Sequence, residues 1–203
     1  MKENLKVLMI NGSPKSNGNT SIALREMEKV FKENGVDVET VTVGNKAIRG
    51  CVACNSCYEK GKCVFDDIVN ELAPKFEEAD GLVVASPVYY ASANATLVAC
   101  LDRLFYSSHF DKTMKVGASI ACARRGGCSA TFDELNKYFT ISGMPIASGI
   151  LPPNLLILST NSRGTEEEPC STIGKPGRRR ETSSRMSKRR GGGTRMPSAL
   201  RVH

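Results

Sequence analysis

The chain has 203 residues, of which 40% are hydrophobic and 24% charged, so it is long enough for one well-packed domain and short for two. Its N-terminal apolar run (5–10) is followed at once by Gly-Ser-Pro and shows no signal-peptide pattern, and no other segment reaches membrane-spanning length. A cytoplasmic protein is therefore expected, in which clustered cysteines more often bind metal or perform redox chemistry than form structural disulfides.

The net charge of +7 lies entirely in the last quarter of the chain. Residues 1–150 contain 17 Lys or Arg and 17 Asp or Glu, whereas residues 151–203 contain 11 and 4. Because the last quarter is rich in Arg, Gly and Ser and lacks apolar periodicity, we predict a folded domain over 1–150 and a disordered basic tail over 151–203. Nucleic-acid binding through this tail is one alternative function, but no aromatic platform or recognition helix accompanies the charges, which argues against it.

Strands and helices are predicted to alternate along residues 1–150. The predicted strands are 6–11, 36–43, 81–86, 115–123 and 145–148, and the predicted helices are 19–34, 67–78, 95–106 and 129–139. This alternation requires a parallel sheet covered on both faces, which is a doubly wound α/β fold. Ligands of such sheets bind beyond the carboxyl ends of the strands. The loops after the first, third and fourth strands are therefore the candidate binding loops.

The first of these loops reads NGSPKSNGNTS (11–21). Its glycines permit tight turns, its hydroxyl and amide side chains can hydrogen-bond, and it opens onto a helix N-terminus that favours a phosphate. An ordinary capped turn is the alternative, because Ser, Asn and Thr are common caps. The loop lacks both the dinucleotide-binding and the nucleoside-triphosphatase motif.

The other two loops offer aromatic and basic side chains. After the third strand, Pro87 fixes a turn and Tyr89 and Tyr90 can receive a flat ring, although they could instead only cover the core. After the fourth strand, the turn ARRGG (123–127) adds two fixed positive charges that could meet an anionic ligand or simply be solvated.

The stretch CVACNSCYEKGKC (51–63) carries four cysteines in a C-x2-C-x2-C-x5-C pattern. One short loop with four thiolates can ligate one [4Fe–4S] cluster, and metal-free thiols and zinc are the alternatives. The candidate metal ligands are Cys51, Cys54, Cys57 and Cys63. Three further cysteines lie in helix or strand contexts and are expected to be packing residues: Cys100, Cys122 and Cys128.

Three motifs in order, GSPKSNGNT, SPVYYASANATLVACLDRLFYS and ARRGG followed by FDELNKYFTISGMP, resemble the flavodoxin-fold NAD(P)H-dependent FMN reductases, specifically the branch with the iron–sulfur flavoproteins. The resemblance covers about residues 5–149. It implies a three-layer fold with a five-stranded parallel sheet of order 2-1-3-4-5, and FMN at the point where the strand order reverses. The cysteine loop is then expected beside the FMN, as an electron relay at the flavin edge.

The same resemblance implies the residues and partners of the site. The expected FMN contacts are Ser13, Lys15, Asn19, Thr20, Pro87, Val88, Tyr89, Tyr90, Ala123, Arg124, Gly126 and Gly127. NAD(P)H is the implied electron donor, and a quinone, a flavin or a ferredoxin-like protein the implied acceptor. A homodimer or homotetramer is implied, in which the cysteine loop approaches a neighbour's flavin. An electron carrier without direct NAD(P)H activity is the alternative.

No catalytic acid or base is assigned. The chain has only two histidines, and His109 is expected on the surface at a helix end. From about Gly149 onward the sequence departs from the family, because it lacks the expected aromatic stretch and final amphipathic helix. We hypothesise a shifted reading frame or a replaced end, which translation of the coding DNA in its other frames tests.

Overall fold

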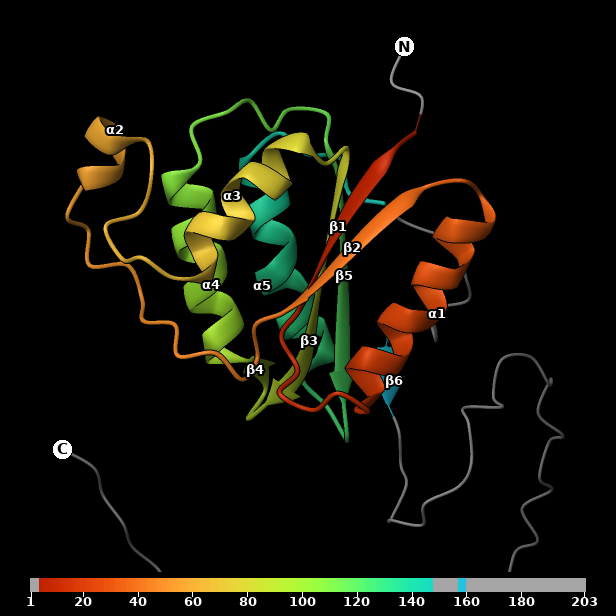
Figure 1. Cartoon of the computed structure of the whole chain (residues 1–203). Helices are drawn as coiled ribbons and strands as arrows, with labels where there is room; N and C mark the ends of the chain where they lie inside the picture. The colour runs from red at the N-terminus through yellow and green to blue at the C-terminus, as the bar shows by residue number, and fades with distance from the viewer. Residues whose placement is uncertain (1–3, 148–156, 160–203) are drawn as a thin grey trace, which may run out of the picture. The chain divides into compact units, whose positions relative to one another are not determined.

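A computed structural model describes residues 4–147 and 157–159, which build a parallel sheet between helices (Figure 1). The parallel strands are β1 (Lys6–Asn11), β2 (Asp37–Thr42), β3 (Gly81–Tyr89), β5 (Val116–Ala123) and β6 (Ile157–Ser159). Their order is β2-β1-β3-β5-β6, and the two-residue strand β4 (Ser92–Ala93) pairs antiparallel with the end of β3. With β4 set aside as part of a hairpin, this is the predicted 2-1-3-4-5 order, so the flavodoxin-like fold is confirmed.

Helices cover both faces of the sheet and give the three layers seen in Figure 1. Helix α1 (Asn19–Glu33) packs on one face, while α3 (Ile68–Glu78), α4 (Ala95–Ser107) and α5 (Cys128–Ile141) pack on the other. Alternate residues of the central strands serve the two faces, because Leu8 points to the three-helix side and Met9 to α1. Within the described part of the chain, no helix is long and apolar enough to cross a membrane.

The last predicted strand differs from the observed one. Pro145 accepts a hydrogen bond from the backbone N–H of Gly117, and the N–H of Ala147 bonds back to Gly117, but 145–147 form only this single bridge. Proline lacks the N–H that a longer ladder needs. Ile157–Ser159 instead pairs with the end of β5, past the boundary predicted at 150. The rest of the predicted tail, and with it the frame-shift hypothesis, lies outside the described residues.

Candidate functional site

Asn11, the last residue of β1, organises the first candidate loop. Its buried side chain accepts a hydrogen bond from the Ser13 backbone N–H at 2.9 Å and donates one to the Ser21 hydroxyl at 2.9 Å. Ser21 in turn donates to the Lys15 carbonyl at 2.8 Å. The loop is therefore closed onto the first turn of α1 by the chain's own hydrogen bonds.

The start of α1 offers backbone N–H groups at this loop. Gly18 is the N-cap residue, and among the described residues no side chain caps the helix there. Thr20, one of the predicted contacts, is buried, and its hydroxyl hydrogen-bonds the Cys122 thiol; burial raises the pKa of that thiol and this bond opposes the rise. The Thr20 side chain thus packs toward the sheet, and the backbone N–H groups at the helix start are the donors that an anion could meet there.

The second loop is a tight hairpin between β3 and β4. Tyr90 and Ala91 form its turn with φ of 49° and 70°, values that two-residue hairpin turns usually assign to Asn or Gly. The ring of Tyr90 is wholly exposed. An aromatic residue held in left-handed backbone is a local strain of about 1–3 kcal/mol, which is typical of functional sites.

Asn94 and Gly127 join the three loops. The Asn94 amide donates to the Gly12 carbonyl at 2.6 Å, which links the hairpin to the first loop, and its carbonyl oxygen caps α4. Gly127 packs so tightly on the hairpin that an added Cβ would lie 2.8 Å from the Cα of Ala91. The three predicted loops therefore meet at one edge of the sheet, the lower edge in Figure 1.

Glu134 of α5 holds the hairpin in place. Its carboxylate accepts hydrogen bonds from the Ser92 hydroxyl at 2.8 Å and the Ala93 N–H at 3.1 Å. The sequence gives no signal for this role, since a glutamate on a predicted amphipathic helix looks like any solvated residue.

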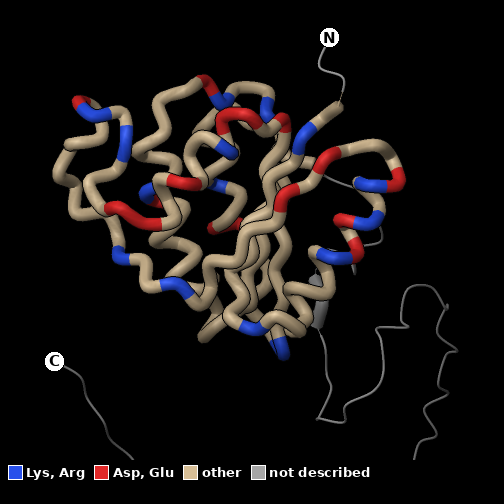
Figure 2. Tube along the Cα trace, viewed as in Figure 1, with Lys and Arg blue, Asp and Glu red and all other residues tan. Residues whose placement is uncertain are grey.

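The predicted contacts differ in exposure. Ser13, Thr20 and Ala123 are buried, Pro87, Val88 and Gly127 are half-buried, and Lys15, Asn19, Tyr89, Tyr90, Arg124 and Gly126 are exposed. The loops that end the strands (12–18, 43–50, 90–94 and 124–127) hold five basic residues and no acidic one. Figure 2 shows the basic residues at this edge. Within the described part of the chain, the side chains of Lys15, Arg124 and Arg125 pair with no carboxylate, so the edge suits an anionic ligand.

We expect Tyr90→Asn to separate stability from binding. Asparagine tolerates left-handed backbone, so the free energy of unfolding of the FMN-free protein should rise by about 0.5–1 kcal/mol. If FMN binds at this edge, as the family resemblance implies, loss of the exposed ring should weaken its binding about tenfold. Denaturant unfolding and fluorescence titration with FMN measure the two effects.

Ala91→Gly is the matched control, because it relieves the same turn and leaves the ring in place. Unchanged FMN affinity in Tyr90→Asn would remove this tyrosine from the site.

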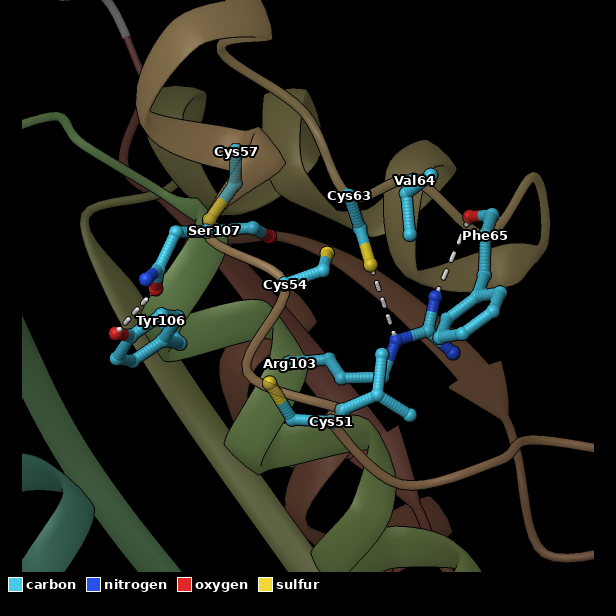
Figure 3. A pocket seen from close by; sticks show the side chains of 11 residues that line it. Cys51, Cys54, Cys57, Cys63, Val64, Phe65, Arg103, Tyr106 and Ser107 are labelled. Carbon is cyan, nitrogen blue, oxygen red and sulfur yellow. Dashed lines mark hydrogen bonds between the residues drawn. The ribbon is translucent and has the colours of Figure 1, made fainter.

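All four predicted cysteines line one pocket (Figure 3). The loop reaches it with left-handed backbone at Ala53, Asn55 and Gly61, and with a five-residue helix α2 (Ser56–Lys60) that was not predicted. The wall of the pocket comes from the second half of α4, including Arg103 and Tyr106. Cys57 is buried, and the other three thiols are exposed or half-exposed.

Arg103 is the residue of this pocket that sequence reasoning missed. Its side chain is fully buried, and it donates to the Cys63 sulfur at 3.3 Å and to both Asp67 oxygens at 2.6 and 2.9 Å. Burial lowers the pKa of Arg103, but its hydrogen bonds to Asp67 and Cys63 outweigh this, so the net direction is upward. The sequence did contain a signal for its role, because Arg103 falls on the apolar face of a predicted helix, where an arginine is rarely buried without a partner.

The donor set suits iron–sulfur or zinc chemistry, because thiolates are the ligands that both prefer. In the part of the chain that the structure describes, no three Cys, His, Asp or Glu side chains converge closely enough to hold a single ion. A cluster places each cysteine on a separate iron, and the four cysteines that such a cluster would need all line this pocket. Hydrogen bonds from Ser56 lower the pKa of Cys54, which favours the thiolate.

The cysteine pocket lies away from the three loops of the same chain, contrary to the expectation that it adjoins them. Asn94, at the start of α4, contacts the first loop, whereas Arg103 and Ser107, farther along the helix, line the pocket. At 1.5 Å per residue, Arg103 and Ser107 lie roughly 13 and 20 Å farther along the helix than Asn94. The long connection after β2 carries the cysteines up the outer side of α4 (Figure 1).

The other three cysteines of the described residues, and His109, lie as predicted. Cys100, Cys122 and Cys128 are buried in the core. His109 is exposed just after α4, where Nε2 lies 3.1 Å from the Cys57 carbonyl and the ring packs at a tilt against Tyr58, with ring centres 5.0 Å apart.

Comparisons with known proteins point in one direction. The family model described as NADPH-dependent FMN reductase matches residues 5–152. An iron–sulfur flavoprotein of Methanocaldococcus jannaschii is 36% identical over 143 residues, which cover 69% of this chain and 74% of that protein. The structure resembles an NAD(P)H:quinone oxidoreductase from Methanothermobacter marburgensis (TM-score 0.61, 14% identity, 80% and 87% of the two chains). It also resembles a flavodoxin from the domain Archaea (TM-score 0.52, 15% identity, 77% and 84%).

Proposed function

Because the chain belongs to the NADPH-dependent FMN reductase family, whose members are flavin oxidoreductases, we propose that it takes electrons from NAD(P)H through FMN and passes them to an acceptor. The observation that carries the proposal is the meeting of three loops at one sheet edge, joined by the Asn94 to Gly12 hydrogen bond and by the packing of Gly127 on the hairpin. Bound FMN would supply hydride acceptance and release of electrons singly or in pairs.

Different groups of the chain would bind the FMN phosphate, the flavin ring and NAD(P)H. The loop that Asn11 closes and the backbone N–H groups at the start of α1 would hold the FMN phosphate. The exposed ring of Tyr90 would lie against the flavin, and the arginines at 124 and 125 would attract the phosphates of NAD(P)H. A quinone, a free flavin or a ferredoxin-like protein would be the acceptor.

We further propose that Cys51, Cys54, Cys57 and Cys63 hold a [4Fe–4S] cluster. Support comes from the shared pocket and from the name of the relative described above, an iron–sulfur flavoprotein. Within one chain the pocket and the FMN loops sit at different parts of α4. In a homodimer or homotetramer, the pocket of one chain would approach the flavin of another, which would shorten the distance for electron transfer between cluster and flavin.

A flavin and iron–sulfur electron carrier is the second candidate, and the cysteine pocket favours it. One experiment separates the two. NADPH or NADH is added anaerobically to the FMN-loaded protein while the flavin absorbance is followed. A reductase should bleach within seconds, faster than free FMN under the same conditions. A carrier would stay oxidised until a reduced ferredoxin is supplied, and that outcome would overturn the NAD(P)H proposal.

A further inference from the structure

Every N–H donor of the buried Arg103 guanidinium has a partner. Nε bonds the Cys63 sulfur, one terminal nitrogen bonds Asp67 and the Arg49 carbonyl at 3.3 Å, and the other bonds Asp67 and the Phe65 carbonyl at 3.3 Å. A guanidinium has five N–H donors in a fixed fork, so this set is complete. A lysine at this position could not reproduce it.

These partners lie on both sides of the cysteine loop. Arg49 precedes Cys51, whereas Phe65 and Asp67 follow Cys63, so one side chain from α4 ties the two ends of the loop to each other. Figure 3 shows the bonds from Arg103 to the Cys63 sulfur and the Phe65 carbonyl. The Phe65 ring adds to this closure, because the guanidinium carbons of Arg49 and Arg103 lie 4.8 and 5.0 Å from its centre.

Cys63 is the thiol that this arrangement fixes most firmly. Asn70 accepts a hydrogen bond from the Cys63 N–H at 3.0 Å and donates to its carbonyl at 3.1 Å, while Arg103 holds the sulfur. Backbone and side chain of Cys63 are thus both restrained by hydrogen bonds inside the chain. Closing a flexible loop costs conformational entropy. Without these hydrogen bonds, the free energy of metal binding alone would have to offset that cost.

We propose that Arg103 is a positioning residue for the cysteine site, which holds loop 49–67 closed and Cys63 in place before any metal binds. The closure follows from the chain's own contacts, and only its use, the seating of a cluster, rests on the proposed function. Asp67 completes the device, because a buried guanidinium without a carboxylate partner is strongly unfavourable.

Hydrogen–deuterium exchange of the full-length, FMN-loaded protein tests the closure. Arg103→Met and Arg103→Lys should each raise exchange across 49–67 about tenfold or more, with lysine giving at most partial rescue. Exchange in β1 and α1 and the FMN content should stay unchanged. Asp67→Asn should act in the same direction, because it removes the carboxylate that pairs with Arg103. Asparagine can still accept the Val69 N–H and cap α3, so this variant leaves the helix start intact. Asp66→Asn, an exposed neighbouring carboxylate, is the control and should match the wild type.

Unchanged exchange across 49–67 in a folded Arg103→Met variant would overturn the proposal. If that variant unfolds throughout, Asp67→Asn decides, and exchange equal to that of Asp66→Asn would likewise overturn it. Iron and sulfide per FMN, measured after anaerobic reconstitution, separate the two proposals. Wild-type protein that never takes up iron rejects the cluster, while the exchange result still decides the role of Arg103. Iron uptake reduced in Arg103→Met and normal in Asp66→Asn supports both.

Discussion

Gly44→Ala should displace the first FMN loop and release the cofactor. A Cβ at Gly44 would lie 2.3 Å from the Gly12 carbonyl oxygen and 2.4 Å from the Ser13 carbonyl carbon, both backbone atoms. Since backbone cannot rotate out of the way as a flexible side chain can, the loop itself must move. We expect a loss of about 3 kcal/mol in the free energy of unfolding. FMN affinity should fall about a hundredfold, as two hydrogen bonds to a charged phosphate would be misplaced.

Gly50→Ala is the matched control for this experiment. Gly50 lies in the same connection after β2, and no described atom lies within 4 Å of the position its Cβ would take. This variant should keep both stability and FMN affinity. Fluorescence titration with FMN and denaturant unfolding measure the two quantities. If Gly44→Ala binds FMN as tightly as Gly50→Ala, the first loop does not hold the phosphate.

Cys57→Ala should abolish the proposed [4Fe–4S] cluster and leave the FMN content unchanged. Cys57 is the buried thiol of the pocket, and a [4Fe–4S] cluster needs a cysteine for each iron. Reconstituted wild-type protein should hold about four irons per chain and the variant fewer than about one. FMN content should not change, because the pocket adjoins the second half of α4 and not the FMN loops.

Cys100→Ala distinguishes ligation from packing. Cys100 is also a buried thiol, but it lies on the face of α4 that packs into the hydrophobic core, where burial raises its pKa to about 12. Its replacement should cost about 1 kcal/mol of stability and leave iron unchanged. An equal iron content in the Cys57 and Cys100 variants would reject the four-cysteine site. If zinc is found instead of iron and sulfide, the site binds zinc and not a cluster.

The family and the fold were predictable from sequence because their signals are local. Buried strands such as β1 and β3 are continuous apolar runs, helices have a 3.6-residue apolar period, and three motifs occur in a fixed order. The parallel topology then brings the loops to one edge without further information. The last strand was partly mispredicted, since the apolar run at 145–148 resembles a strand but starts with a proline that limits pairing.

The contacts that build the two sites could not be predicted, because they join residues far apart in the chain. Asn94 meets Gly12 across 82 positions, and Arg103 meets Cys63 across 40. Neither pairing leaves a trace in local periodicity. The position of the cysteine loop depends on the path of the connection after β2, which has no regular pattern, and α2 is too short at five residues to show one.

Helix α4 imposes a length constraint on the protein. Asn94 contacts the first candidate loop and Arg103 bonds the cysteine loop, and these two residues are nine positions apart in the sequence, which is about 2.5 helical turns. Inserting or deleting one residue between them would turn Arg103 by about 100° around the helix axis and shift it by about 1.5 Å. Substitutions on the solvent side of α4 should therefore be tolerated, whereas changes in its length should not.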